Sequence, residues 1–176
     1  MQLKSTPIPG LIEVQATLYE DERGVFARTY DEELFSHADL PTSWPQCNTS
    51  WNNRRGTLRG MHWQAAPKEE FKLVRCTAGR VYDVAVDLRR ESPTYLNWFG
   101  LELSASWRNA LFIPAGFAHG FLTLCDNSEV YYQMGAAYDS ALRRGARWND
   151  PLFAIAWPFE PAVISERDAG FPDYVP

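Results

Sequence analysis

The sequence predicts an all-β sandwich or barrel, folded as a single domain over residues 1–176. Short strand-like runs follow one another along the chain, and turn residues separate them at short intervals. No linker rich in Pro, Gly or Ser divides the chain, and no internal repeat is present. Hydrophobic residues make up 45% of the chain and aromatic residues 14%. Because a chain of this length buries about 70% of the surface that its unfolded form exposes, this composition supplies a full core.

The predicted strands occupy runs that are rich in β-branched and aromatic residues. In order they are VFARTY, GTLRGMHWQ, FKLVRCTAGRVYDVAVDL, NWFGLELS, ALFIPAG, HGFLTL and SEVYYQM. One helix is expected early in the chain, in DEELFSHADL, because acidic residues open it and Pro41 follows it. A second helix near the carboxyl end has only a weak signal.

Residues 71–88, FKLVRCTAGRVYDVAVDL, form the best-defined unit. If residues 78–79 make a two-residue turn, the two runs pair as a hairpin, with Lys72 diagonal to Asp83 on the less apolar face. Such a pair is either an exposed cross-strand ion pair or part of a lined cavity. The opposite face is predicted to be core, because it is more apolar. It carries Leu73, Tyr82, Val84, Val86 and Leu88.

The net charge limits the classes of partner, and the cysteine content indicates the cellular compartment. The formal net charge of −5 argues against nucleic acid as a partner, since phosphate binders are usually basic, but a small anion needs only local positive charge. Cys47, Cys76 and Cys125 are odd in number and form no CxxC motif, which fits reduced thiols in the cytoplasm. The start MQLKSTPIPG is unlike a signal peptide, and no apolar run approaches ~20 residues. We therefore expect a soluble cytoplasmic protein without a membrane partner.

The run FIPAGFAHG, residues 112–120, has the spacing P-x-G-x-x-H and resembles the second half-motif of the cupin superfamily. The first cupin half-motif supplies H-x-H and then a Glu for a metal. Here the chain offers His62, then Gln64 in place of the second His, then Glu69. Because an amide is a much poorer transition-metal ligand than imidazole, the favoured interpretation is a cupin barrel without a strong metal site. A metal enzyme using these three residues with His119 is the alternative.

Without a metal, His62 is a candidate general base. A lone His on a strand is more often a hydrogen-bonded structural residue, yet imidazole is the side chain best suited to move a proton near neutral pH. Proton abstraction also needs a group that stabilises a negative oxygen, for which Lys72 is the candidate, and an acid, for which Tyr132 is the candidate. Tyr131 and Tyr132 are neighbours on one predicted strand, so only one of them faces a cavity.

The blocks of sequence then resemble one family as a set. DERGVFARTY, QCNTS, GTLRGMHWQ, KLVRCTAGRVYDVAVDLRRESPTY, LSA, FIPAGFAHGFLTL, WNDP, IAWP and SERDAGFP follow one another in the order typical of dTDP-4-dehydrorhamnose 3,5-epimerases. The resemblance covers roughly residues 10–172, nearly the whole chain. Each block is a weak signal alone, and together they are highly specific.

This resemblance implies a cupin-type jelly roll, a homodimer, and no metal or organic cofactor. The substrate it implies is a nucleotide-linked 4-keto-6-deoxy sugar, whose ketone acidifies the C–H bonds at C3 and C5. Such sugars serve the biosynthesis of deoxysugars for surface polysaccharide or glycosylated metabolites. The implied reaction inverts C5, C3 or both, by removing a proton from one face and returning one to the other. A non-catalytic module that binds nucleotide sugars is a further alternative.

The resemblance also implies roles for single residues. His62 matches the base, and Asp168, in SERDAGFP, matches the carboxylate that orients it and stabilises the imidazolium. Lys72 matches the residue that supports the enolate, and Tyr132 matches the acid on the opposite face. Further substrate-binding positions implied by the resemblance are Gln46, Asn48, Ser50, Asp83, His119 and Tyr138.

Two arginines match residues that hold the diphosphate: Arg59 in GTLRGMHWQ and Arg23 in DERG. The planar guanidinium suits this role because it binds phosphate oxygens in pairs. Strict alternation puts Arg59 on the opposite face from His62, so a bulge or bend at Gly60 is needed to turn both inward. The resemblance implies that the segment of Arg23 crosses to the partner subunit. The alternatives are a turn residue for Arg23 and an exposed surface residue for Arg59.

Several positions depart from the family pattern, mainly at the nucleotide end. Arg28 and Arg143 stand where the family usually has Glu, and Glu70-Phe71 replaces a Gln and a small residue. A carboxylate accepts hydrogen bonds from a base N–H, whereas a guanidinium only donates, so a nucleobase other than thymine becomes an open choice. Alternatively the two arginines pair with nearby acids or contact phosphate. Glu70 is expected to alter sugar contacts.

Overall fold

The computed structural model describes residues 1–176 and is mainly β, as the sequence predicts. The first strands are β1 Gln2–Ser5, β2 Ile12–Gln15, β3 Leu18–Asp21, β4 Gly24–Ala27, β5 Gln46–Asn52, β6 Thr57–Gln64 and β7 Lys72–Ala78. The later strands are β8 Arg80–Asp87, β9 Trp98–Ser104, β10 Ala110–Ile113, β11 Phe117–Thr123, β12 Ser128–Met134, β13 Arg143–Gly145 and β14 Val163–Ile164. The helices are α1 Glu32–His37 and α2 Glu166–Ala169, and neither is long enough to cross a membrane.

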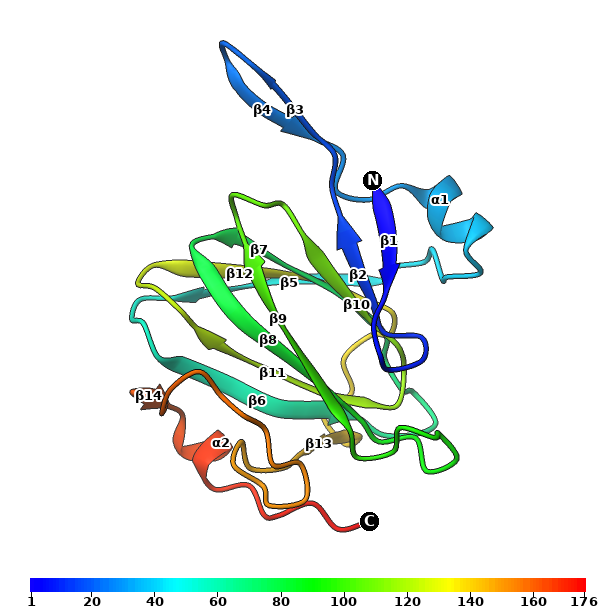
Figure 1. Cartoon of the computed structure of the whole chain (residues 1–176). Helices are drawn as coiled ribbons and strands as arrows, with labels where there is room; N and C mark the ends of the chain where they lie inside the picture. The colour runs from blue at the N-terminus through cyan, green and yellow to red at the C-terminus, as the bar shows by residue number, and fades with distance from the viewer.

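Two sheets pack face to face as a jelly roll (Figure 1). One sheet has the order β1-β2-β10-β7-β12-β5, and the other has the order β13-β6-β11-β8-β9. Neighbouring strands on these paths are antiparallel, and β14 adds to β6 in parallel. Strands distant in sequence therefore lie side by side, and the predicted jelly-roll architecture is confirmed.

Apolar side chains fill three layers. The interior between the sheets holds the largest buried cluster, which includes Val74, Val81 and Phe121. Phe35 of α1 packs on the outer face of the first sheet, and the segment after β13 covers the outer face of the second sheet through residues such as Phe153. Figure 1 shows these two coverings on opposite sides of the sandwich. The helix expected in DEELFSHADL is thus present, and it begins at its N-cap Asp31.

The hairpin predicted for residues 71–88 is wrong. β7 pairs with β10 and β12 in one sheet, whereas β8 pairs with β11 and β9 in the other. Gly79, with φ of +72°, turns the chain from one sheet into the opposite one. Lys72 and Asp83 are therefore not cross-strand neighbours. The residues that share each face were predicted correctly, but the face predicted as core does not face the interior. Val74, Val81 and Ala85 meet between the sheets, whereas Leu73 packs under α1 and Val84 packs under the segment after β13.

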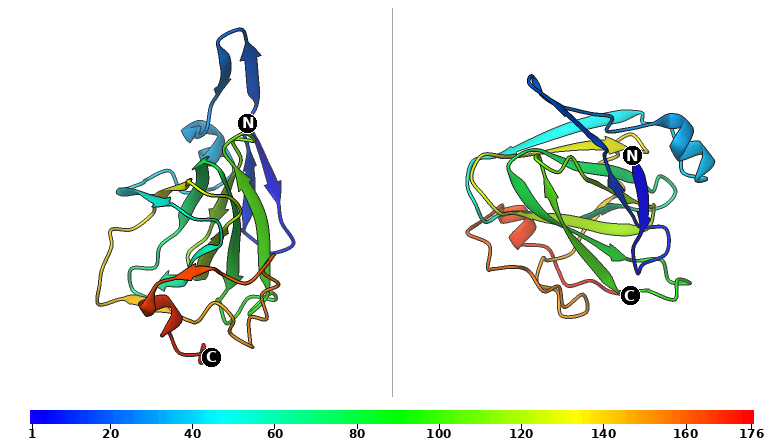
Figure 2. Two further views of the ribbon diagram at one scale, coloured as in Figure 1. Left: turned by 90° about the vertical axis from the view of Figure 1, so that its left-hand side faces the viewer. Right: turned by 45° about the horizontal axis from the view of Figure 1, so that its top comes forward.

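A two-stranded hairpin of β3 and β4 projects from the body of the protein (Figures 1 and 2). It carries apolar side chains in water: Tyr19 is 61% exposed and Phe26 is 69% exposed. The two rings lie 6.3 Å apart. A protruding hairpin with exposed aromatic rings is a feature of surfaces that bind another molecule.

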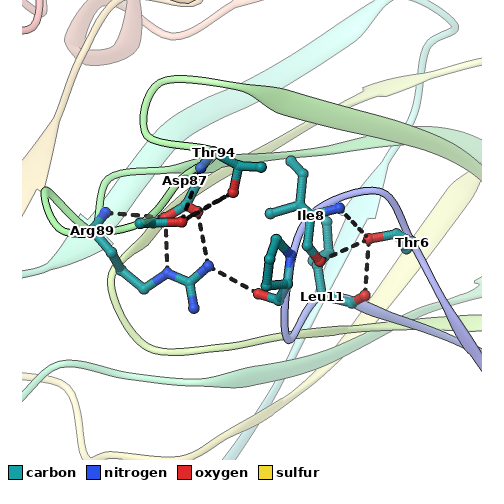
Figure 3. Close-up of polar contacts among 8 residues, drawn as sticks. Thr6, Ile8, Leu11, Asp87, Arg89 and Thr94 are labelled. Carbon is teal, nitrogen blue, oxygen red and sulfur yellow. Dashed lines mark hydrogen bonds and ion pairs between the residues drawn. The ribbon is translucent and has the colours of Figure 1, made fainter.

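A buried carboxylate joins the amino-terminal loop to the end of β8 (Figure 3). Asp87, whose side chain is fully buried, accepts hydrogen bonds from Arg89 Nε at 2.8 Å and from Ser92 and Thr94 hydroxyls. Arg89 Nη2 also donates to the carbonyl of Pro9 at 2.9 Å. Burial by itself raises the pKa of Asp87, but these hydrogen bonds outweigh it and lower the pKa to about 2.

We expect Asp87→Asn to lower the free energy of unfolding at pH 7 by about 2 kcal/mol. The pKa of Asp87 is lower in the folded chain than its ordinary value of 3.8, so its contribution is complete above that value. It is lost as the pH falls through about 2. Urea unfolding at pH 7 and at an acid pH near that pKa measures this, and the difference between variant and wild type should shrink in acid.

Asp173→Asn is the control for the loss of an aspartate. Asp173 pairs with Arg147, but its side chain is 49% exposed. Exposed ion pairs contribute less than about 1 kcal/mol, so this variant should unfold close to wild type. Equal losses in the two variants would contradict the role given to Asp87.

Candidate active site

The largest cavity lies between the two sheets and has a volume of about 700 Å³. Its walls come from β5, β7 and β12 of one sheet, from β6 and β11 of the other, and from residues 163–168 of the carboxyl-terminal segment. Eight of the residues predicted from the sequence line it together: Asn48, Ser50, Arg59, His62, Lys72, His119, Tyr132 and Asp168.

A smaller cavity of about 330 Å³ adjoins the first. The two cavities share wall residues, among them His62 and Lys72, so they form one continuous trough. The smaller end adds the predicted residues Gln46, Tyr138 and Arg143. Gln46 Oε1 accepts a hydrogen bond from the backbone N–H of Tyr138 at 3.0 Å, which joins β5 to the loop before β13.

A bend in β6 turns both Arg59 and His62 into the trough. Gly60, between them, has φ of +141°, and the pairing of β6 with β11 shifts register at this point. The two backbones approach so closely that a Cβ on Gly60 would lie 2.6 Å from the Cα of Gly120. The bulge predicted at Gly60 is therefore present, and it overrides strict alternation.

His62 and Asp168 form a dyad. The distance from His62 Nε2 to Asp168 Oδ1 is 2.9 Å, and the Asp168 side chain is 3% exposed. Asp168 Oδ2 also accepts from the backbone N–H of Gly60 at 3.2 Å, and Arg167 Nε lies 3.2 Å from Oδ1. Ser165 caps α2 by accepting from the N–H of Asp168, which fixes the carboxylate on its helix. The dyad thus joins two segments 106 residues apart.

The electrostatics of the dyad leave one imidazole nitrogen free to take a proton. Burial raises the pKa of Asp168, but hydrogen bonds from His62, Gly60 and Arg167 outweigh it and lower that pKa to about 2. Burial lowers the pKa of His62 below 6.5, although Asp168 opposes this shift. At neutral pH an ionised carboxylate thus faces a neutral imidazole. Because a carboxylate only accepts, Nε2 carries the hydrogen and the lone pair is on Nδ1.

Tyr132 is the tyrosine that faces the cavity, and its hydroxyl lies 3.1 Å from Ser50 Oγ. Burial raises the pKa of Tyr132 well above 10, so it keeps its proton at neutral pH. Tyr131 faces the other side of β12, where it lines a separate hollow with Arg75. Strand alternation decides which tyrosine can serve as an acid.

A second carboxylate–imidazole pair lies deeper in the cavity wall. His119 Nε2 lies 2.8 Å from Asp83 Oδ1, and Asp83 is fully buried. β11 places His119 directly opposite His62 of β6, and its ring lies 6.2 Å from that of Tyr132. The polar residues predicted from four separate segments thus converge on one cavity.

The trough carries an excess of positive charge in a chain of net charge −5. Four cations line it: Arg59, Lys72, Arg143 and Arg167. Two carboxylates line it, Glu70 and Asp168, which leaves a formal excess of two positive charges. The Nε of Arg59 donates to Asn52 Oδ1 at 2.8 Å, so its guanidinium is held in place before any ligand binds. Such a site suits a ligand with two negative charges.

Comparison with known proteins assigns the chain to a family. A sequence model described as dTDP-4-dehydrorhamnose 3,5-epimerase matches residues 5–175. The protein of that name from Methanothermobacter thermautotrophicus is 43% identical over 166 residues, which cover 93% of this chain and 89% of the relative. The chain belongs to the dTDP-4-dehydrorhamnose 3,5-epimerase family.

Solved structures of this epimerase family share the fold closely. The dTDP-4-dehydrorhamnose 3,5-epimerase of Bacillus anthracis, solved with TDP and PPi bound, has a TM-score of 0.95 at 35% identity and covers 98% of this chain and 99% of its own. NovW, a 4-keto-6-deoxy sugar epimerase from the novobiocin biosynthetic gene cluster of Streptomyces spheroides, has a TM-score of 0.94 at 36% identity and covers 98% and 87%. The first of these proteins thus binds a nucleotide, and the second is an epimerase of a keto sugar.

Three residues predicted for the epimerase site do not line the trough of their own chain: Asp83, which is buried behind His119, and two arginines that are exposed. Arg23 is at the tip of the projecting hairpin, where it pairs with Asp21 and its side chain is 84% exposed. Arg28 pairs with Asp31, the N-cap of α1, and is 67% exposed. The pairing of Arg28 with a nearby acid is one of the two alternatives raised by its sequence.

The four residues of the alternative metal site do not form one ligand set, although His62 and His119 lie opposite each other. The amide of Gln64 is fully engaged, since its Nε2 donates to the carbonyls of Lys68 and Ala137 and its Oε1 accepts from the N–H of Asp139. Glu69 is exposed, lies beside Gly116, and lines neither cavity. No group of three or more His, Cys, Asp or Glu side chains in the chain is placed to hold a metal ion.

Several wall residues were not predicted from the sequence. Arg167 lines both cavities. Its position next to Asp168 in SERDAGFP is the sequence signal by which it could have been predicted. The remaining unpredicted walls are mostly apolar or small and have no chemical signature in sequence: Thr57, Leu58, Phe121, Met134, Val163, Ile164 and Ser165.

We expect Gly60→Ala to destabilise the epimerase more than Gly24→Ala. Both glycines have positive φ, but a Cβ on Gly24 has nothing within 4 Å, whereas a Cβ on Gly60 collides with Gly120. The backbone cost alone is about 1 kcal/mol, and the collision adds about 1–3 kcal/mol. Chemical denaturation of both variants measures the difference, and equal losses would contradict the close approach of β6 and β11.

Proposed function

We propose that this chain is a cofactor-independent epimerase of a nucleotide-linked 4-keto-6-deoxy sugar, folded as one domain over residues 1–176. The observation that supports it most is the His62–Asp168 dyad at 2.9 Å, which shares one cavity with the Tyr132 hydroxyl. A base with a free lone pair and a protonated acid in the same cavity are the two groups that inversion next to a ketone requires. Membership of the family agrees with this chemistry.

The first step removes a proton from a carbon beside the C4 ketone. Nδ1 of His62 takes the proton, the C–H electron pair forms a double bond to C4, and the carbonyl electrons move to the oxygen. Asp168 stabilises the imidazolium that results, because its carboxylate is ionised and only 3% exposed. Lys72 stabilises the negative oxygen, since its ammonium group lines the same cavity.

The second step returns a proton to the opposite face of the carbon. The enolate electrons re-form the ketone, and the carbon takes the proton of the Tyr132 hydroxyl, which inverts the centre. The imidazolium of His62 then releases its proton to water, and the phenolate of Tyr132 takes one from water, which restores the neutral base and the acid. Ser50 Oγ, 3.1 Å from the phenolic oxygen, is its hydrogen-bond partner. The same two steps invert C5, C3 or both. His119 contacts the sugar in this proposal, as do Gln46, Asn48, Ser50 and Tyr138. Asp83, predicted as a substrate-binding residue, is fully buried and lines neither cavity, so it acts by holding His119.

The diphosphate is proposed to bind Arg59, and Arg23 of a second copy completes the site in a homodimer. The projecting hairpin with exposed Phe26 supports this, because it offers apolar surface to a partner. A hollow on the outer face of the first sheet also holds Arg75, whose Nε and Nη1 are buried without a hydrogen-bond partner. These N–H groups need hydrogen-bond acceptors, and a second copy packed on this face would supply them. Sedimentation as a monomer at micromolar concentration would contradict this arrangement.

The nucleobase is proposed to contact the smaller end of the trough, which Arg143 lines. A guanidinium donates hydrogen bonds and accepts none. Arg28, carried on the segment after the hairpin, joins Arg143 from the second copy. This end therefore favours a base that presents acceptors. The three free cysteines, Cys47, Cys76 and Cys125, support the cytoplasm as the compartment.

Proton exchange in D2O tests the function. The protein is incubated with dTDP-, CDP-, GDP- and UDP-4-keto-6-deoxyglucose, and deuterium at C3 and C5 is followed by NMR. We expect incorporation with at least one donor, and the donor with the highest rate identifies the base. A non-catalytic module would bind the nucleotide sugar without incorporating deuterium. That result would contradict the epimerase proposal.

Two variants separate the base from the acid. We expect His62→Ala to reduce exchange by about 10²–10⁴-fold, because no other group takes the proton. Tyr132→Phe should impair formation of the inverted product more than it impairs loss of the first proton. Near wild-type exchange in His62→Ala would show that the base is another residue.

The pH dependence follows from the pKa of His62. The base acts only when neutral, and burial lowers its pKa below 6.5, so kcat/KM should hold down to pH 6.5 and fall below it. Asp168 raises the pKa of His62, so Asp168→Asn should move this acid limb to still lower pH while reducing kcat by about 10²-fold or more. A limb that moves to higher pH in Asp168→Asn would contradict the dyad.

A further inference from the structure

Glu70 forms a buried ion pair with Lys72 at the junction of the two cavities. Its Oε1 lies 2.8 Å from Nζ of Lys72, and the side chains are 11% and 7% exposed respectively. Glu70 lines the smaller cavity, and Lys72 lines both. No other carboxylate lies within ion-pairing distance of Lys72. The pair is therefore part of the trough wall and not a surface feature.

The fold fixes the direction of both side chains through Phe71. The ring of Phe71 packs between Trp44 and Phe112 with centroid distances of 5.2 and 6.2 Å. Its backbone carbonyl accepts from the N–H of Gly135 at 2.8 Å, and a Cβ on Gly135 would lie 2.4 Å from the ring. With Phe71 held on the outer side of the sheet, alternation turns the residues before and after it toward the trough.

A lysine in this position needs such a partner. Its ammonium group is carried on a flexible four-carbon stem, and it is a compact, strongly hydrated charge. Burying it without a partner is costly, and the rotamers of the stem leave its position undefined. One carboxylate oxygen at 2.8 Å satisfies part of the charge and leaves further N–H groups of Nζ free to donate.

We propose that Glu70 is a positioning residue for Lys72, which it holds beside His62 so that the ammonium group meets the oxygen of the enolate. This inference rests on the proposed epimerase function. Glu70 acts through Lys72 and not by touching the sugar. Its loss therefore slows proton transfer, while affinity for the nucleotide sugar changes little, because the diphosphate contacts lie elsewhere in the trough.

A double-mutant cycle tests the inference with the donor that the wild-type protein accepts. We expect Glu70→Gln to reduce the rate of deuterium incorporation about tenfold, with KM changed less than about threefold. In a Lys72→Met background, Glu70→Gln should cause no further loss, because the group that it positions is absent. Glu70→Asp, which keeps the charge, should recover part of the rate.

Asp139→Asn is the matched control. Asp139 pairs with Lys68 at 2.9 Å near the smaller cavity, but that pair is open to solvent and lines neither cavity. This variant should exchange at the wild-type rate. Denaturation curves and binding of the nucleoside diphosphate, measured for every variant, report any loss of folding.

The outcomes separate the inference from the function on which it rests. If wild-type protein exchanges no proton with any donor, both are overturned. If wild type exchanges but Glu70→Gln reduces the rate by the same factor with and without Lys72, Glu70 contacts the substrate directly and the positioning role is overturned. A rise in KM as large as the fall in kcat/KM would overturn the positioning role as well.

Discussion

The carboxylate of Asp168 is the interaction on which the rest of the site depends. It binds His62 Nε2 at 2.9 Å, the backbone N–H of Gly60 at 3.2 Å and Arg167 Nε at 3.2 Å. It thereby fastens the carboxyl-terminal segment to the strand that carries the candidate base. The same contact sets the tautomer of the imidazole, so the position of the base and its chemistry have one cause.

The jelly roll makes this contact available because it brings distant segments to one opening. β5, β7 and β12 supply one wall of the cavity, and β6 and β11 supply the other. β11 also sets the bend at Gly60, since Gly120 leaves no room for a Cβ there. A regular β6 would direct either Arg59 or His62 into the trough, but the bent strand directs both. The irregularity of one strand thus joins a phosphate-binding group to a proton-transfer group.

Local charge explains how an acidic protein can bind an anion. The trough has two more cations than carboxylates, and one of those carboxylates, Glu70, is itself paired with a cation. The paired Lys72 and Glu70 are buried at the junction of the cavities. Arg143 has no carboxylate partner, and Arg167 shares Asp168 with His62. The arrangement separates a pre-positioned charge near the base from charges that are available to a ligand.

Much of the site could be predicted from the sequence because chemistry-bearing residues keep their spacing within blocks. His62, Tyr132, Asp168 and the bend at Gly60 were predicted, and the structure brings the three side chains to one cavity. The pairing of residues 71–88 was not predicted correctly. A short turn and alternating residues fit both a hairpin within one sheet and a crossing between two sheets, and periodicity does not distinguish them.

The sequence by itself therefore determined the fold class, the family and the kinds of chemical group in the site. Only the tertiary structure decided which strand pairs with which, because β7 finds its partners in β10 and β12 rather than in the adjacent β8. It also decided the pairing of charges: His62 with Asp168, His119 with Asp83, and Lys72 with Glu70. Hydrogen bonds and ion pairs depend on separations of about 3 Å, and for residues far apart in the chain such separations are set by packing and not by sequence spacing.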